Sequence, residues 1–325
     1  MSVNVPIPEK FSSDIIASSG ADYVTGVGIK FHDYQSGNTD GDLIKIQVKS
    51  IKFNKKAGAP ADQPFVDDLL PEEKGTVKSV YFPTKDYTNE KNYNKHAWVY
   101  LPAGYDADDK DTKYPVFVLL HGMGQNENTW GLTDQGRGGK IKGYMDHNMK
   151  DGSSEKFILF VVSGISAEDT QGGYNFTAYN YFGSELREYV LPYLWENYNV
   201  YKDRDHTALA GLSMGGGQTF DRGIGENLDL ISYFGGFSAA TFTPADEYKK
   251  NVDDNWDADL KINHLYMICG DADSTVYSSF PGYVEAMEKW TSRIEKFTSY
   301  VYPGGTHDFP VWYYGFNEFS KLIFK

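Results

Sequence analysis

The segment GLSMG at residues 211–215 follows the apolar run at residues 206–210 and decides how the rest of the chain is interpreted. It has the pattern G-x-S-x-G, in which a serine lies at the apex of a sharp turn between a β-strand and an α-helix. Small residues on both sides of that serine let the strand and the helix approach each other closely. The segment therefore predicts that Ser213 is a catalytic nucleophile at the end of a strand.

Composition narrows the classes of partner. The chain has 325 residues, a formal charge of −14 and 40% hydrophobic residues. An acidic protein repels a phosphate backbone, so we expect no nucleic-acid partner. No apolar run reaches the ~20 residues that a membrane span needs, so we expect no membrane partner either. Residues 1–20 lack the apolar core of a signal peptide, which indicates a cytoplasmic protein or one whose signal lies outside this sequence.

The only cysteine, Cys269, lies in an apolar run, so we expect a buried, inert thiol and no internal disulfide. Two aspartate-rich loops, at residues 106–111 and 270–274, lack the glycine and glutamate spacing of an EF-hand. The sequence therefore predicts no metal site.

The chain divides near residue 75. Residues 24–31 and 43–53 alternate apolar and polar side chains, as half-buried strands do, and residues 57–64 have the composition of a linker. We expect residues 1–75 to form a small β-rich extension or the remnant of a carbohydrate-binding module, and residues 76–325 to form the main domain. A complete β-sandwich needs more chain than the extension offers.

From about residue 78 onward, short apolar strands alternate with helical segments, which predicts a three-layer α/β sandwich with a mainly parallel central sheet. The expected strands are residues 79–82, 97–101, 115–120, 157–162, 206–210, 233–237, 265–269 and 299–302. The expected helices are residues 141–149, 182–197, 214–225, 282–297 and 314–324.

Two further residues complete a candidate catalytic triad. His307 lies in a glycine-flanked loop between the last expected strand and the last helix, where it can reach the sheet edge that carries Ser213. The acid that orients such an imidazole should follow the strand ending at Cys269, where Asp271 and Asp273 compete. We favour Asp273, which is farther from the strand and can reach back, and expect Asp271 to cap the turn.

An oxyanion hole needs two backbone N–H groups, one of them from the residue after the nucleophile. Met214 supplies that group. The second should come from Met123 in the loop HGMG at residues 121–124, because Gly122 lets the backbone turn inward. We expect His121 to hold this loop.

Four stretches together resemble the feruloyl esterases of carbohydrate esterase family 1, which have the α/β-hydrolase fold. They are WVYLPAGY at 98–105, LLHGMG at 119–124, GLSMGGGQ at 211–218 and GTHDFPVW at 305–312. The resemblance covers residues 78–325 and implies nucleophile Ser213, base His307, acid Asp273 and oxyanion donors Met123 and Met214, with no metal or organic cofactor. It does not account for the N-terminal segment.

The resemblance implies hydrolysis of feruloyl esters on arabinoxylan or xylo-oligosaccharides by a secreted enzyme. Such domains often occur beside carbohydrate-binding or glycanase modules in a longer chain. Two alternatives remain open: an acetylxylan or short-chain acyl esterase, and a non-catalytic carbohydrate-binding protein on the same scaffold.

Several aromatic residues lie near the expected site in sequence and are candidates to bind the aromatic acyl group. They are Trp130, Tyr174, Phe176, Phe237, Phe309 and Trp312. We expect only two or three of them to contact substrate and the others to belong to the core.

Overall fold

The computed structural model describes residues 68–133 and 140–325 of the chain. The strands expected at residues 24–31 and 43–53 lie outside the described residues. The N-terminal extension and the division of the chain near residue 75 therefore stay predictions.

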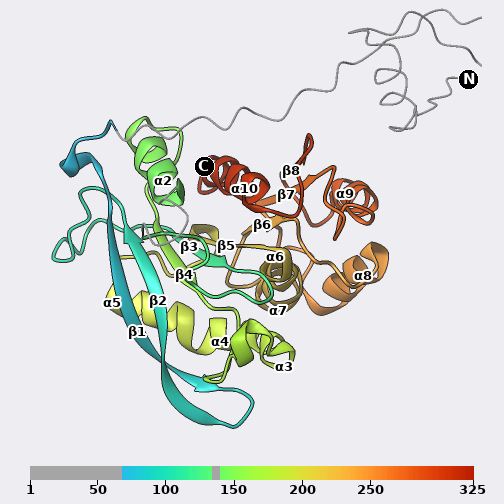
Figure 1. Cartoon of the computed structure of the whole chain (residues 1–325), viewed down its shortest axis with the longest axis horizontal. Coiled ribbons are helices and arrows are strands. Elements are labelled where there is room, and N and C mark those ends of the chain that lie inside the picture. The colour runs from blue at the N-terminus through green and yellow to red at the C-terminus, as the bar shows by residue number, and fades with distance from the viewer. Residues whose placement is uncertain (1–67, 134–139) are drawn as a thin grey trace, which may run out of the picture. The chain divides into compact units, whose positions relative to one another are not determined.

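An eight-stranded sheet with the order β1-β2-β4-β3-β5-β6-β7-β8 forms the centre of the fold (Figure 1). Strands β3 to β8 run parallel to one another, and the hairpin of β1 and β2 joins antiparallel at the edge of β4. The strands are β1 (Thr76–Asp86), β2 (Lys91–Leu101), β3 (Val116–Leu120), β4 (Ile158–Val162), β5 (Thr207–Leu212), β6 (Tyr233–Phe237), β7 (His264–Gly270) and β8 (Phe297–Tyr302). The predicted mainly parallel sheet is confirmed.

Helices cover both faces of this sheet (Figure 1). The helices of four or more residues are α2 (Lys140–Lys150), α3 (Phe176–Tyr179), α4 (Phe182–Glu185), α5 (Leu191–Asn197), α6 (Ser213–Gln218), α8 (Ala245–Asn255), α9 (Phe280–Glu288) and α10 (Phe309–Leu322). The π-helical segment η3 (Leu186–Val190) joins α4 to α5, and η5 (Thr219–Ile224) joins α6 to α7 (Gly225–Asn227).

Each inner strand divides its side chains between two hydrophobic cores, because successive residues of a strand point to opposite faces. In β3, Val118 and Leu120 belong to one core, whereas Phe117 and Leu119 belong to the other. The first core is closed by residues of α4, η3, α5, η5, α8 and α9, and the second by residues of α2 and α10. This is the predicted three-layer arrangement.

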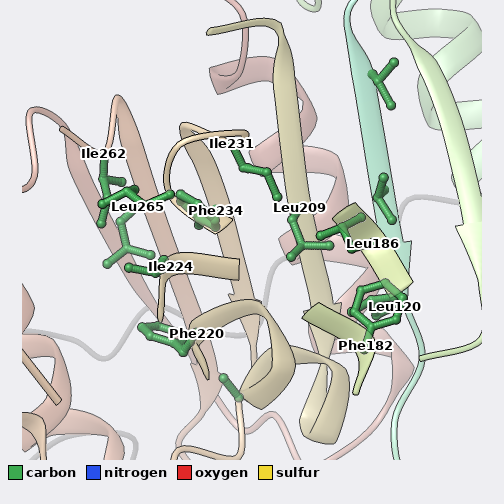
Figure 2. Packing of buried hydrophobic residues seen from close by; sticks show 14 of the residues in the cluster. Leu120, Phe182, Leu186, Leu209, Phe220, Ile224, Ile231, Phe234, Ile262 and Leu265 are labelled. Atoms are coloured by element: carbon green, nitrogen blue, oxygen red, sulfur yellow. The ribbon is translucent and has the colours of Figure 1, made fainter. Parts of the chain in front are cut away.

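The first core shows how the helices and strands interlock (Figure 2). Phe220 and Ile224 of η5 point toward Phe234 and Leu265 on neighbouring strands, and all four side chains are fully buried. Burying one such side chain stabilises the fold by about 1.5–3 kcal/mol. This packing holds η5 against the sheet, and with it α6, which η5 follows directly.

Two predicted helices have clearly different bounds in the structure, and neither α3 nor α8 was predicted. Helix α9 ends at Glu288 rather than at Phe297, and Phe297 is instead the first residue of β8, where it pairs with Leu265 of β7. Helix α10 begins at Phe309 rather than near residue 314. Asp308 caps it by accepting a hydrogen bond from the Phe309 N–H at 2.7 Å, and a proline occupies its first turn.

Candidate active site

Ser213 is the first residue of α6 and lies in the sharp turn after β5. Its backbone φ is +50°, a left-handed conformation that is costly for a residue with a side chain. The flanking glycines make the turn possible. A Cβ on Gly211 would lie 2.4 Å from the carbonyl carbon of Gly215, and one on Gly215 would lie 2.3 Å from the carbonyl oxygen of His121. The close approach of backbones therefore requires both glycines.

Three side chains from three strand ends form one hydrogen-bonded series. Ser213 Oγ lies 2.9 Å from His307 Nε2, and His307 Nδ1 lies 2.8 Å from Asp273 Oδ2. The three residues follow β5, β7 and β8, whose carboxyl ends meet at one edge of the sheet. In this arrangement the imidazole can take a proton from the serine hydroxyl while the carboxylate fixes its orientation.

The carboxyl group of Asp273 is fully buried, whereas His307 is partly exposed. Burial raises the pKa of Asp273, but hydrogen bonds from His307 and from the backbone outweigh it and hold that pKa below its ordinary value. The backbone donors include the N–H groups of Thr275 and Val276, at 2.9 and 3.1 Å from Oδ1. Asp273 is therefore ionised and rigidly held beside the imidazole.

Gly122 brings the loop after β3 against Ser213. A Cβ on Gly122 would lie 3.2 Å from the Cβ of Ser213 and 2.7 Å from a methyl group of Leu212. The backbone N–H of Met123, the next residue, has no acceptor among the described residues. Met214 follows Ser213 in the first turn of α6, where backbone N–H groups have no partner within the helix. The assignment of these two N–H groups as oxyanion donors stays a prediction.

His121 is a buried, neutral structural residue of this loop. Its Nδ1 lies 2.7 Å from the carbonyl oxygen of Gly122, which can only accept, so Nδ1 carries the proton. Its Nε2 accepts from the backbone N–H of Gly164 at 3.3 Å and lies 3.0 Å from the hydroxyl of Ser163. Burial lowers the pKa of His121 to about 4. The side chain thus holds the loop, as expected.

Four of the six aromatic candidates are covered by other side chains. Trp130 and Phe237 are fully buried and Phe309 nearly so, and the three rings pack edge to face in the second core. Trp312 is also buried, with its ring centroid 5.2 Å from that of His307. A covered ring presents no surface to a ligand, so the expectation of substrate contact is corrected for all four: Trp130, Phe237, Phe309 and Trp312. These rings belong to the second core.

Two segments, residues 174–176 and the loop after β6, carry exposed aromatic side chains. Tyr174 and Phe176 are 55% and 53% exposed, and the hydroxyl of Tyr174 would lie 2.8 Å from a Cβ on Gly124. Phe242, which the sequence analysis missed, is 73% exposed. It lies two residues after Ala240, whose N–H donates to the Ser213 carbonyl at 2.9 Å. Its place shortly after the strand at residues 233–237 was the signal that could have found it.

Within residues 68–133 and 140–325, no group of three or more His, Cys, Asp or Glu side chains is arranged to hold a metal ion. No helix in those ranges has the length and apolar character that a membrane span requires. Cys269 is buried, and burial together with the nearby Asp273 raises its pKa to about 12. Its thiol is therefore not a nucleophile at neutral pH.

Comparison with known proteins agrees with this geometry. Residues 88–218 match the model of the Esterase family. An endo-1,4-beta-xylanase/feruloyl esterase of Xylanibacter ruminicola is 27% identical over 253 residues, which are 77% of this chain and 32% of that protein. Endo-1,4-beta-xylanase Y of Acetivibrio thermocellus is 30% identical over 237 residues, 66% of this chain and 20% of that protein. The chain thus spans a third or less of these relatives.

Solved structures show the same fold. A carbohydrate esterase family 1 ferulic acid esterase from Anaeromyces mucronatus, in complex with ferulic acid, superposes with a TM-score of 0.65 at 23% identity, covering 84% of this chain and 98% of that one. A feruloyl esterase module from Clostridium thermocellum, complexed with sinapinate, gives a TM-score of 0.64 at 21% identity, covering 84% and 96%. The chain therefore has the α/β-hydrolase fold of these enzymes, and the predicted resemblance to the feruloyl esterases of carbohydrate esterase family 1 is confirmed.

Proposed function

We propose that this chain is a serine esterase that removes hydroxycinnamoyl groups such as ferulate from arabinoxylan or xylo-oligosaccharides. The observation that carries the proposal is the series of Ser213, His307 and Asp273, joined by contacts of 2.9 and 2.8 Å. These distances are those of a nucleophile, its base and the acid that orients the base.

In the first half of the reaction, Ser213 Oγ attacks the ester carbonyl while its proton passes to His307 Nε2. The carbonyl oxygen becomes an anion and takes hydrogen bonds from the N–H groups of Met123 and Met214. When the tetrahedral intermediate collapses, the bond to the sugar oxygen breaks and His307 gives its proton to that oxygen. The sugar leaves as an alcohol, and the acyl group stays on Ser213.

Water completes the reaction by the same steps. It attacks the acyl carbonyl and gives a proton to His307, and the intermediate collapses to release the carboxylic acid. The proton on His307 returns to Ser213 Oγ. The ionised Asp273 stabilises the imidazolium in both halves, and no step needs a metal or an organic cofactor.

Two observations support an aromatic acyl group. Relatives and structural neighbours are named as feruloyl or ferulic acid esterases. The loops around Ser213 also expose Tyr174, Phe176 and Phe242, which offer apolar surface to a ring. A phenyl ring that loses about 150 Å² of apolar surface gains about 4 kcal/mol, of which ordering takes about half. An acetyl group lacks this gain.

We also propose that the chain works outside the cell, beside carbohydrate-binding or glycanase modules of a longer parent protein. The two xylanases that it matches are each at least three times as long as the matched region. The extension predicted from the sequence, residues 1–75, would then contribute no catalytic group. A protein that starts at residue 68 keeps the contact of Glu73 with Lys150, 2.7 Å long, and should hydrolyse methyl ferulate at the full rate.

The proposal is tested by kcat/KM for methyl ferulate, methyl sinapate and an acetate ester with an equally good leaving group, together with acetate release from acetylated xylan. We expect the feruloyl ester to exceed the acetate by about 30-fold or more, which corresponds to about 2 kcal/mol. Equal values would favour the acetyl esterase alternative. No labelling of Ser213 by a fluorophosphonate would favour a non-catalytic protein.

A further inference from the structure

The carbonyl oxygen of Gly122 is held by two donors in the protein interior. One is the protonated Nδ1 of His121, at 2.7 Å, and the other is the hydroxyl of Tyr179, at 3.0 Å. Both side chains are buried, and Tyr179 lies 57 residues away at the end of α3. A carbonyl with two buried donors has little freedom to rotate.

The direction of this carbonyl fixes the direction of the Met123 N–H. The described chain contains no cis peptide bond, so the carbonyl of Gly122 and the N–H of Met123 point to opposite sides of one planar unit. Since the carbonyl points to His121 and Tyr179, the N–H points away from them. Gly122 itself lies against Ser213, as the 3.2 Å approach of its Cβ position to the Ser213 Cβ shows.

Gln218 links this arrangement to the helix of the nucleophile. Its side-chain Nε2 donates to the carbonyl oxygens of Gly164 and Tyr179, at 2.7 and 2.9 Å. Both acceptors are carbonyls, so the amide nitrogen must be the atom that faces them. Gly164 in turn donates its N–H to His121 Nε2 at 3.3 Å. The contacts close into a buried ring that runs through Gln218, Gly164, His121, Gly122 and Tyr179.

We propose that Tyr179 and Gln218 are positioning residues that aim the Met123 N–H at the oxyanion through the Gly122 carbonyl. The inference rests on the proposed esterase function and names the residues that prepare its oxyanion hole. Neither side chain touches the triad. Their effect is on the transition state, because the aimed N–H gains most of its strength when the carbonyl oxygen becomes an anion.

The test compares Tyr179→Phe with Tyr248→Phe. Tyr248 is the matched control, since its buried hydroxyl also donates to a backbone carbonyl, that of Phe220, at 3.0 Å. Loss of a whole oxyanion donor costs about 10²–10³ in kcat, and Tyr179 supplies one of the two bonds that aim the donor. For Tyr179→Phe we therefore expect kcat on methyl ferulate to fall about tenfold, with KM within twofold of the wild type.

A second readout separates positioning from general damage. Phenylboronic acid forms a tetrahedral adduct with a nucleophilic serine, so its inhibition constant should rise about tenfold in Tyr179→Phe. Inhibition by the product ferulate should stay within twofold, and the midpoint of thermal unfolding should match that of Tyr248→Phe. A kcat within twofold of the Tyr248→Phe value overturns the inference.

Two further measurements keep the result unambiguous. If the wild type hydrolyses 4-nitrophenyl acetate and Ser213→Ala does not, the esterase activity is established independently of this ring. If the wild type is inactive on both 4-nitrophenyl acetate and methyl ferulate, the proposed function itself is overturned. Should Tyr179→Phe fail to fold, Gln218→Met decides in the same way. A kcat for Gln218→Met equal to that of Tyr248→Phe overturns the inference.

Discussion

The carboxylate of Asp271 accepts a hydrogen bond from the backbone N–H of Gly304 at 2.6 Å. Asp271 therefore ties the loop after β7 to the loop that carries His307, while its neighbour Asp273 contacts the imidazole itself at 2.8 Å. Two aspartates separated by one residue thus make different contacts, since one ties two loops together and the other contacts His307.

These two aspartates should respond differently to the same substitution. Asp273→Asn should lower kcat by about 10³–10⁴, because the imidazole loses the anion that orients it and stabilises its cation. Asp271→Asn should mainly lower stability, by about 1 kcal/mol, because it weakens one bond to a backbone N–H. Steady-state kinetics and urea unfolding of both variants check this. If Asp271→Asn is inactive and Asp273→Asn is active, then Asp271 is the acid that orients His307 and Asp273 is the residue that fixes the loop.

Ser213→Ala should abolish hydrolysis and leave the fold intact. The substitution removes the nucleophile, and loss of a triad member costs about 10⁴–10⁶ in kcat. It removes no buried packing group and keeps a small side chain in the strained turn. The measurement is kcat on methyl ferulate, with circular dichroism and the unfolding midpoint as controls. Retention of a tenth of the wild-type activity would rule out Ser213 as the nucleophile.

The value of kcat/KM should decrease toward acid pH because the binding of one proton inactivates the enzyme. His307 Nε2 must be unprotonated to accept the serine proton, so protonation stops the reaction. Asp273 stays ionised over this range because its pKa lies below the ordinary value, and His121 stays neutral because its pKa is about 4. A plot of log kcat/KM against pH should therefore reach a slope of one. A flat profile from pH 5 to 9 would contradict a histidine base.

Stability should also fall toward acid pH. Burial lowers the pKa of His121 and of His264 to about 4 in the folded chain, against about 6.5 when unfolded. Between these values the unfolded chain binds protons that the folded chain does not, so the free energy of unfolding decreases as pH falls. The loss is about 2 kcal/mol per histidine at pH 5. Urea unfolding at pH 7 and pH 5 measures this loss. Between these two pH values, the free energy of unfolding of His264→Asn should decrease by about 2 kcal/mol less than that of the wild type.

Gly215→Ala should prevent folding or cost more than about 3 kcal/mol. The new Cβ would lie 2.3 Å from the carbonyl oxygen of His121, and a backbone atom between a strand and a loop cannot move aside. Gly282→Ala in α9 is the matched control, since nothing lies within 4 Å of its Cβ position. There we expect a gain of up to about 1 kcal/mol. Soluble expression and urea unfolding compare the two. Equal stabilities would show that the backbone can yield at Gly215.

The turn at Ser213, the strand runs and the order of the serine, aspartate and histidine could be read from the sequence because each depends on local chain properties. A turn that strains its serine needs glycines at fixed spacing, and a strand covered on both faces reads as a continuous apolar run. Parallel strands also bring their carboxyl ends to one edge of the sheet. These rules bring Ser213, His307 and the loop with Asp271 and Asp273 to that edge, whereas the folded loop decides that Asp273 contacts His307.

Tertiary structure decided what depends on neighbours distant in sequence. Trp130 and Tyr174 looked equally suited to bind a ring, but packing against Phe237 and Phe309 covers Trp130 and leaves Tyr174 exposed. Phe297 looked like the end of a helix, but it pairs with Leu265 of β7 and begins β8. The ring that holds the Gly122 carbonyl joins a tyrosine 57 residues away to the loop after β3. No local pattern encodes such a contact, because it exists only once the sheet has brought the two segments together.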